Sequence, residues 1–199
     1  MTTPVGRMTA EERREQLLDV TKEIAFAHGF HAVSIEAVAR AAGITRPIVY
    51  SHFRDLPGLL EALVDRESSR ALSQLAAVLP TGLEGRDPRE LLPAALRGYL
   101  EVVEGDPATW RLVLMPPDGA PVVLRDRIAR GRSAVVAQLA DVVRPGLGPG
   151  TEPPDPELTA VMLSAVSDEA ARLLLTEPGR YPVDRLVALA EWALRRFVS

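Results

Sequence analysis

The sequence has no cysteine and few residues of the kinds that ligate metals or act as nucleophiles. The absence of cysteine from all 199 residues excludes disulfide bonds and thiolate metal sites. The only histidines are His28, His31 and His52, and no two of them have the spacing of metal ligands on one helix face. The chain also lacks a glycine-rich phosphate loop followed by lysine, and it lacks G-x-S-x-G. We therefore expect no enzyme, no cofactor and no metal.

Long apolar runs are also missing. No segment approaches the roughly 18 apolar residues of a membrane span, and the N-terminus lacks the basic-then-apolar pattern of a signal peptide. Apolar residues make up 47% of the chain and charged residues 25%, which is ordinary for a soluble globular protein. We expect a cytoplasmic protein of one or two small domains, with no membrane partner.

Positive charge is scarce, which bears on whether the chain binds nucleic acid. The net charge is −4, with a slight excess of cations (+1) over residues 1–54 and the acidic balance (−5) in the remainder. This distribution argues against nonspecific binding to nucleic acids. It still allows a compact DNA-binding module, because such a module needs only a local basic face to contact phosphates.

Residues 34–55 contain the pattern of a helix-turn-helix. Ser34 is a good N-cap for a short helix, since its hydroxyl can accept a hydrogen bond from a free backbone N–H. Gly43 follows where the chain must leave that helix, because glycine tolerates the left-handed conformation found there. Thr45 then caps a second short helix, and Pro47 falls in its first turn, where a missing N–H costs nothing. Apolar side chains recur with helical spacing on the first helix, at Ile35, Val38, Ala39 and Ala42.

The second helix, at 45–53, has one side for packing and one side for a partner. Val49 and Phe53 point the same way and are expected to pack. On the other side, Arg46 can reach a guanine edge through a bidentate pair, and Tyr50 can donate to phosphate. On hydrophobic pattern alone, a pair of helices packed in a bundle is the alternative. The predicted DNA-contacting residues are Ser34, Thr45, Arg46, Pro47, Tyr50, Ser51, His52 and Arg54.

This stretch resembles the N-terminal DNA-binding domain of the TetR/AcrR family of bacterial transcriptional regulators, over about residues 10–62. The resemblance implies an all-helical homodimer whose C-terminal domain binds a small molecule and thereby controls operator binding. Members of the family usually carry a phosphate-contacting lysine where Leu56 stands and a small residue where Pro47 stands; Arg54 is a candidate replacement for the lysine. The matching residues are Ser34-Ile35, Val38-Ala39, Ala42-Gly43-Ile44-Thr45, Val49-Tyr50, His52-Phe53 and Leu59-Leu60.

The rest of the chain is predicted to be helical, with proline and glycine at the joints. There is no β-alternation of useful length. We expect an all-α protein of about nine helices, in which a three-helix DNA-binding domain (1–55) precedes a larger helical bundle for ligand binding and dimerisation (56–199). Helices are expected at about 9–28, 35–42, 45–53, 57–79, 89–103, 107–115, 121–143, 156–176 and 183–198. The resemblance implies that the helix at 57–79 transmits ligand binding to the DNA-binding domains.

The last two segments, 156–176 and 183–198, are apolar on two sides. Such helices must be buried on two sides, and one of these can be covered by a second subunit. We therefore predict an isologous four-helix interface with twofold symmetry; burial within one chain is the alternative. The predicted interface residues are Leu158, Met162, Val166, Leu173, Leu186, Leu189, Ala193 and Phe197.

A ligand pocket is expected among the bundle helices between residues 89 and 176. Few charged residues stand at core-facing positions there, apart from Arg111 and Arg172, so the predicted effector is small and largely apolar, with at most one anionic or hydrogen-bonding group. Each candidate lining residue also fits an ordinary core. The candidates are Tyr99, Trp110, Leu114, Met115 and Met162.

Together with the family resemblance, these patterns predict a dimeric, ligand-responsive repressor that binds a palindromic operator in double-stranded DNA through the helix at 45–53. Two alternatives remain open. One is a DNA-binding regulator without a small-molecule switch, either an activator or a partner-controlled protein. The other is a helical dimeric ligand-binding protein that no longer binds DNA.

Overall fold

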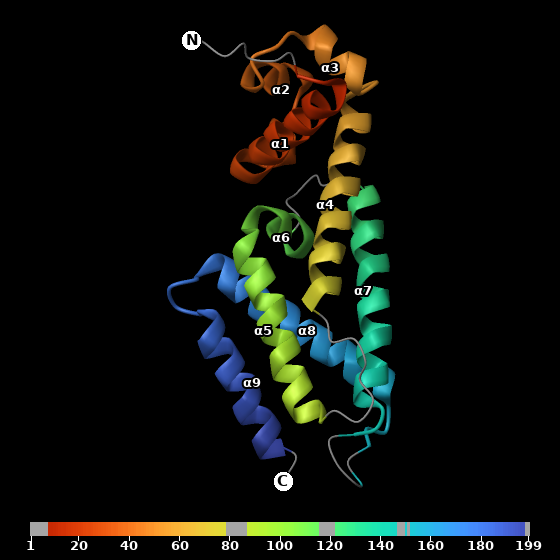
Figure 1. Cartoon of the computed structure of the whole chain (residues 1–199), viewed down its shortest axis with the longest axis vertical. Coiled ribbons are helices and arrows are strands. Elements are labelled where there is room, and N and C mark those ends of the chain that lie inside the picture. The colour runs from red at the N-terminus through yellow and green to blue at the C-terminus, as the bar shows by residue number, and fades with distance from the viewer. Residues whose placement is uncertain (1–7, 79–86, 116–121, 147–149, 151, 198–199) are drawn as a thin grey trace, which may run out of the picture. The chain divides into compact units, whose positions relative to one another are not determined.

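A computed structural model describes residues 8–78, 87–115, 122–146, 150 and 152–197. The described residues form nine α-helices and one short 3-10 helix (η1), and none of them lies in a strand (Figure 1). The predicted all-α class is therefore confirmed. Within the described part of the chain, no helix is long and apolar enough to span a membrane.

The chain divides into two compact units, and the division falls inside α4 (Leu56–Val78), after Glu67. The first unit comprises Met1–Glu67 and Pro116–Arg125, and the second comprises Ser68–Met115 and Asp126–Ser199. The functional boundary that the sequence places after residue 55 stays a prediction.

The first unit is built on short helices that pack around a small apolar core. α1 contacts η1, α2 and α3, and α2 packs against α3. A capping box begins α1: the Thr9 hydroxyl accepts from the Glu12 N–H at 3.1 Å, and the Glu12 carboxylate accepts from the Thr9 N–H at 2.7 Å. This backbone N–H holds the pKa of Glu12 below its ordinary value. The helices are α1 (Ala10–His28), η1 (Phe30–Ala32), α2 (Ile35–Ala41) and α3 (Arg46–His52), followed by the start of α4.

Two turns of this unit depend on glycine in a left-handed conformation. Gly29 ends α1 with φ 82°, and its N–H donates to the Ala25 carbonyl at 3.0 Å. Gly43 joins α2 to α3 with φ 66°. A Cβ at position 29 would lie 3.0 Å from His31 Nδ1, whereas a Cβ at position 43 would meet no atom within 4 Å.

Gly29→Ala is therefore expected to destabilise the protein more than Gly43→Ala. The combination of φ 82° and ψ 165° at Gly29 is accessible to glycine almost alone, so alanine should cost about 1–3 kcal/mol there. At Gly43 only the positive φ opposes alanine, at about 1–2 kcal/mol and without a steric clash. Urea unfolding of the two variants measures the difference. An equal or larger loss for Gly43→Ala would contradict this account of the turns.

Three helices of the second unit begin at an Asp-Pro step. In each, the aspartate is the N-cap and its carboxylate accepts a hydrogen bond from a backbone N–H of the first turn, while the proline stands where no N–H is needed. The acceptor–donor pairs are Asp87 with the N–H of Arg89 (2.8 Å), Asp106 with that of Thr109 (3.3 Å) and Asp155 with that of Leu158 (2.9 Å).

The core of the second unit is centred on α5. α5 lies beside both α8 and α9, and α6 packs on α8 (Figure 1). The fully buried side chains Leu100, Val103, Leu174 and Val187 lie in this core. The observed helices lie within two residues of the predicted segments at the ends that the structure describes; Leu79 lies outside the described residues. They are α5 (Pro88–Gly105), α6 (Pro107–Leu114), α7 (Val122–Val143), α8 (Pro156–Thr176) and α9 (Val183–Phe197).

Candidate DNA-binding surface and ligand cavity

The helix α3 has the two sides that the sequence predicts. Val49 and Phe53 are buried in the core of the first unit, which confirms the packing side. Tyr50, on the other side, keeps 51% of its surface exposed, and Ile48 is exposed as well. Thr45, Arg46, Pro47, Ser51 and Arg54 are also exposed, whereas Ser34 and His52 are half-buried. The first unit therefore presents one continuous outer face of α3 to solvent.

Thr45 stands at the N-cap of α3, but its hydroxyl does not cap the helix, contrary to the prediction. An N-cap side chain accepts from the second or third N–H of the helix. The second position is Pro47, which has no N–H, and the third N–H, of Ile48, donates to the Thr45 carbonyl at 3.0 Å. Ser34, by contrast, caps α2 as predicted and accepts from the Ala37 N–H at 3.1 Å.

Arg46 is held by a partner that the sequence analysis missed. Its guanidinium lies 2.6 Å from a carboxylate oxygen of Glu36 on α2, and both side chains are largely exposed. The hydrogen bond from Arg46 holds the pKa of Glu36 below its ordinary value. An exposed pair of this kind is worth little in water, so Arg46 can exchange Glu36 for another acceptor.

Arg14 supports the end of α3 from inside the unit. Its guanidinium carbon lies 4.5 Å from the ring centroid of Phe53, and its Nη1 donates to the His52 carbonyl at 3.3 Å. A cation over an aromatic face is attracted by the ring quadrupole. Arg14 therefore holds the last turn of α3 in place. The charged sequence of the first turn of α1 does not indicate this role.

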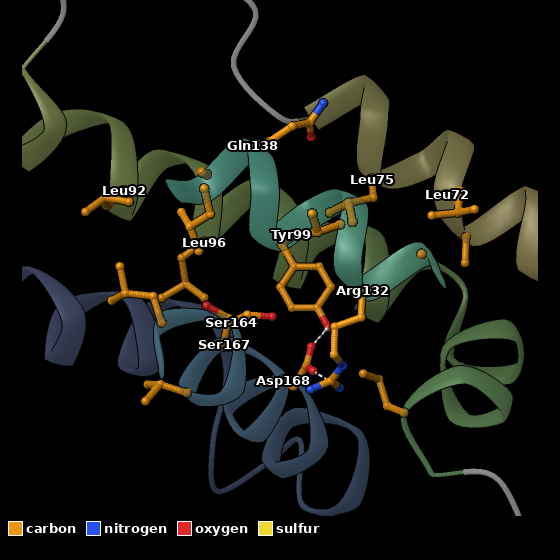
Figure 2. Close-up of a pocket in the computed structure, with 18 of the residues that line it drawn as sticks. Leu72, Leu75, Leu92, Leu96, Tyr99, Arg132, Gln138, Ser164, Ser167 and Asp168 are labelled. Atoms are coloured by element: carbon orange, nitrogen blue, oxygen red, sulfur yellow. Dashed lines mark hydrogen bonds and ion pairs between the residues drawn. The ribbon is translucent and has the colours of Figure 1, made fainter. Parts of the chain in front are cut away.

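The second unit contains a partly open cavity of about 790 Å³ with a mostly apolar lining (Figure 2). Of the predicted ligand residues, Tyr99, Trp110 and Leu114 line it. Met115 packs half-buried against the core, and Met162 is 60% exposed on α8; neither belongs to the lining. Further apolar lining side chains come from α4 and α5, including Leu72, Leu75, Leu92 and Leu96.

One side of this cavity carries a polar group of three residues. The Tyr99 hydroxyl donates to Asp168 Oδ1 at 3.1 Å, and Arg132 forms an ion pair with Asp168 Oδ2 (Figure 2). Burial, reinforced by the negative charge of Asp168, raises the pKa of Tyr99, so its hydroxyl keeps its proton. The sequence analysis did not assign Arg132 or Asp168 to the pocket, because they are 36 residues apart and look like ordinary charges on amphipathic helices.

Arg111 and Arg172, which the sequence places at core-facing positions, donate to backbone carbonyls. Arg111 donates to the Leu175 carbonyl at 2.6 Å, and Arg172 donates to the Leu114 carbonyl at 3.1 Å. Each bond joins α6 and α8 at a backbone carbonyl near a helix end, where acceptors lack intrahelical donors. These arginines therefore tie the two helices together.

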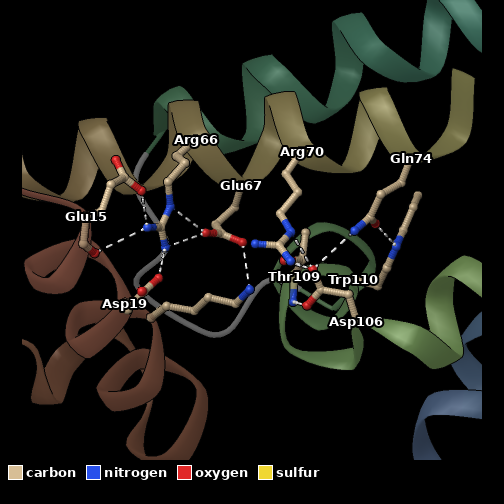
Figure 3. A network of polar contacts seen from close by, with 10 residues as sticks. Glu15, Asp19, Arg66, Glu67, Arg70, Gln74, Asp106, Thr109 and Trp110 are labelled. Atoms are coloured by element: carbon tan, nitrogen blue, oxygen red, sulfur yellow. Dashed lines mark hydrogen bonds and ion pairs between the residues drawn. The ribbon is translucent and has the colours of Figure 1, made fainter. Parts of the chain in front are cut away.

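Polar contacts join α4 to α6 beside the cavity (Figure 3). Arg70 Nε lies 2.8 Å from Asp106 Oδ2, and Gln74 donates to the same oxygen at 3.2 Å. Trp110 Nε1 donates to Gln74 Oε1 at 2.8 Å, and the Trp110 ring meets the Tyr99 ring edge-on at 5.3 Å. A cavity-lining side chain on α6 is therefore hydrogen-bonded to α4.

Exposed apolar side chains form a stripe along α8, and further ones lie on α9. Leu186 and Leu173, predicted at a subunit interface, pack against the core of their own chain, and Leu186 is only 8% exposed; their place at an interface stays a prediction. Ala193 and Val166 line the cavity, although Val166 is also well exposed, and the side chain of Phe197 lies outside the described residues. The exposed members of the stripe are Leu158, Val161, Met162, Val166, Leu189 and Trp192.

Comparison with known proteins links this geometry to transcriptional regulators. Residues 17–63 match the family model of the bacterial regulatory proteins, tetR family. Over 180 residues the chain is 26% identical to the HTH-type transcriptional activator FasR of Mycolicibacterium smegmatis, which covers 90% of this chain and 79% of FasR.

Two solved structures share the fold. A TetR-like transcriptional regulator from Rhodococcus sp. RHA1 matches with a TM-score of 0.75 at 24% identity, over 96% of this chain and 98% of that one. The transcriptional regulator FadR from Bacillus subtilis, in complex with stearoyl-CoA, matches with a TM-score of 0.65 at 19% identity, over 93% and 97%. At these identities the two structures show likeness of fold alone.

Proposed function

Because the chain belongs to the TetR family of bacterial transcriptional regulators, we propose that it binds a palindromic operator as a dimer, represses transcription, and is released by a small, largely apolar effector. The observation that carries this proposal is the presence, on one chain, of an outward-facing helix α3 and a separate apolar cavity. The first feature suits DNA recognition, and the second suits a ligand that controls it.

In the proposed complex, α3 lies in the major groove with its exposed face toward the bases. Arg46 exchanges Glu36 for a guanine, and Tyr50 donates to a phosphate. The unengaged hydroxyl of Thr45 is available to a second phosphate near the helix start. The remaining predicted contacts, from Ser34, Pro47, Ser51, His52 and Arg54, belong to the same proposal.

The exposed stripe on α8 and α9 supports dimerisation. Large apolar side chains gathered on consecutive helices mark an interaction surface when they form a contiguous patch. Paired with its twofold copy, the stripe would give a four-helix interface that buries Leu158, Met162 and Leu189. Such a dimer places two α3 helices on the two half-sites of a palindrome.

The size and lining of the cavity support an effector with an apolar body. A volume of about 790 Å³ lies within the range of about 300–1,000 Å³ typical of small-molecule sites. FadR from Bacillus subtilis, which shares the fold, holds stearoyl-CoA, a ligand with a long apolar chain. The leucines that line the cavity here are suited to a similar apolar segment.

We propose that the effector acts by shifting a population of conformations. A ligand that binds better to a conformation with wrongly spaced α3 helices draws the dimer away from DNA. The hydrogen bond from Trp110 to Gln74, together with Arg70 and Asp106, links the cavity wall to α4. α4 continues along the chain into the first unit, so it is the proposed route of the signal.

Gln74→Leu is expected to weaken this coupling while leaving both ligand and operator binding in place. The leucine keeps the bulk of the side chain but removes its bonds to Trp110 and Asp106. Since coupling between sites is typically about 1–3 kcal/mol, we expect the effector to lower operator affinity several-fold less in the variant. Titrations of operator binding with and without a saturating effector measure this. Coupling equal to that of the parent protein would contradict the proposed route.

Activation is a second candidate for the direction of control. FasR, which is 26% identical over 90% of this chain, is named a transcriptional activator. The physical switch would be the same, with ligand binding changing the fit of the dimer to DNA. Transcription from the bound promoter, measured in vitro with and without the protein, separates the two directions.

A mobility-shift assay with the DNA that flanks the gene tests the proposed function. At two salt concentrations, selective binding that weakens as salt increases is expected, because phosphate contacts release counterions. Apolar ligands added to the same complex should then release the DNA. Binding that is equally strong to unrelated DNA would contradict the proposal.

A further inference from the structure

We propose that the cavity selects effectors whose polar end is uncharged, such as an alcohol, a ketone, an ester or an amide, carried on an apolar body. This inference rests on the proposed function, in which the cavity of the second unit holds the effector. It goes further by specifying the chemistry of the ligand's head group.

The charges of the described lining residues cancel. Two arginines and two aspartates line the cavity, Arg127 and Arg132 against Asp141 and Asp168. Asp141 is exposed and also lies 3.4 Å from Arg144. Tyr99 itself stays neutral because burial raises its pKa. The formal charges of the described lining residues therefore sum to zero.

The Arg132–Asp168 pair opposes either kind of ion (Figure 2). Only 14% of the Asp168 side chain is exposed, and its two oxygens already accept from Tyr99 and Arg132. An anionic head group that reached Arg132 would come close to the Asp168 carboxylate. A cationic head group that reached Asp168 would come close to the Arg132 guanidinium. Either approach brings like charges together where solvent screening is weakened.

A neutral polar group meets no such opposition. Arg132 has five N–H donors, and a carboxylate has several lone pairs, so both retain hydrogen-bonding capacity within the pair. Ser164 and Ser167 of α8 add hydroxyl groups to the same wall (Figure 2). A hydroxyl or carbonyl can therefore join this group without displacing a charge.

A second observation is compatible with a neutral polar head group. Ser68, on α4, lines the cavity, and its Oγ is buried without a hydrogen-bond partner among the described residues. Buried polar groups are nearly always hydrogen-bonded, so an unsatisfied hydroxyl facing a cavity suggests a ligand atom that pairs with it. A neutral donor or acceptor of the ligand can pair with this hydroxyl.

Three ligands that share a twelve-carbon chain test the proposal: 1-dodecanol, dodecanoate and dodecylamine. Calorimetry at pH 7.5, below aggregation concentrations and without DNA, gives their affinities for the full-length protein. We expect the alcohol to bind at least about tenfold more tightly than either ion. Equal or tighter binding of dodecanoate or dodecylamine would overturn the proposal, as would the absence of saturable binding by all three.

Variants of the pair sharpen the test. Asp168→Asn keeps an acceptor for Tyr99 but removes the anion, so affinity for dodecanoate relative to dodecanol should rise at least about tenfold. Arg132→Gln should raise the relative affinity for dodecylamine in the same way. Glu169→Gln is the matched control, since Glu169 is the next carboxylate on α8, is exposed, pairs with Arg172 and does not line the cavity. Unchanged selectivity in Arg132→Gln, or a shift of equal size in the control, would overturn the proposal.

The outcome of these ligand-binding measurements does not depend on whether the protein binds an operator. If Asp168→Asn fails to fold, as judged by its thermal transition, the partly exposed Arg132 still provides a variant. Because binding is measured without DNA, head-group selectivity can hold even if operator binding fails. Conversely, if the three ligands show no such selectivity but operator binding responds to another ligand, the proposed regulator is supported and the selectivity proposal is wrong.

Discussion

Tyr50→Ala is expected to weaken binding to every DNA sequence, whereas Arg46→Ala should mainly relax the choice among sequences. Tyr50 is exposed on α3 and is proposed to donate to a phosphate, which is the same in all DNA. Arg46 is proposed to contact a guanine edge, a contact worth about 1–3 kcal/mol of discrimination. Competition assays with the operator and its single-base variants measure both effects.

Tyr50→Phe is the matched control for the first variant, because it removes only the hydroxyl and keeps the ring. If phosphate contact is the role of Tyr50, the phenylalanine variant should lose most of what the alanine variant loses. The salt dependence of binding should stay unchanged in both, since tyrosine neutralises no phosphate charge. Operator binding like that of the parent protein by both Tyr50→Ala and Arg46→Ala would refute the assigned recognition surface.

Glu67→Ala should cause a large loss of stability in the first unit. Glu67 is only 2% exposed, and its carboxylate lies 2.8 Å from Lys22 Nζ and 2.8 Å from the Arg66 guanidinium (Figure 3). Removing one partner of a buried charge pair costs about 3–5 kcal/mol, because the remaining charge loses its compensation in a poorly hydrated site. Urea unfolding of the full chain, followed by circular dichroism, measures the change in unfolding free energy.

Asp19→Asn provides the control for this prediction. Asp19 contacts the same Arg66 guanidinium at 2.9 Å, but its side chain is 63% exposed. Exposed ion pairs contribute about 1 kcal/mol or less, so this variant should differ little from the parent protein. Losses of equal size in the two variants would show that burial of Glu67 does not govern its contribution.

The helices and the helix-turn-helix could be predicted because their signals are local. Thr9, Ser34 and Gly43 act on the backbone within a few residues of their own positions, and the Asp-Pro steps begin helices in the same local way. The periodic apolar residues of α3 likewise separated Val49 from Tyr50. Thr45 failed as a cap for an equally local reason, the missing N–H of Pro47, which the prediction overlooked.

The polar contacts could not be predicted, because their partners are distant in the sequence. Arg132 pairs with Asp168 across 36 residues, and Lys22 meets Glu67 from another helix. On a helix, each of these residues is indistinguishable by pattern from a solvated surface charge. Only the packing of the helices decides which charges meet and which are buried.

The apolar surfaces of α8 and α9 show a similar limit. Both helices are apolar on more than one side, and the pattern does not say which side meets the core of the same chain. Leu186 packs inside, whereas Leu189, one turn further on, is exposed. The distinction comes from how α9 lies against α5, a tertiary property that the sequence pattern does not contain.

The most direct measurement is selection of binding sites from random double-stranded DNA by the purified full-length protein. The proposed regulator should enrich a palindrome whose half-sites are spaced by about one helical turn or a multiple of it, and bind it at least about 10³-fold more tightly than unrelated DNA at physiological salt. Failure to enrich any sequence, with the same weak affinity for all DNA, would contradict the conclusion that this chain reads an operator through α3.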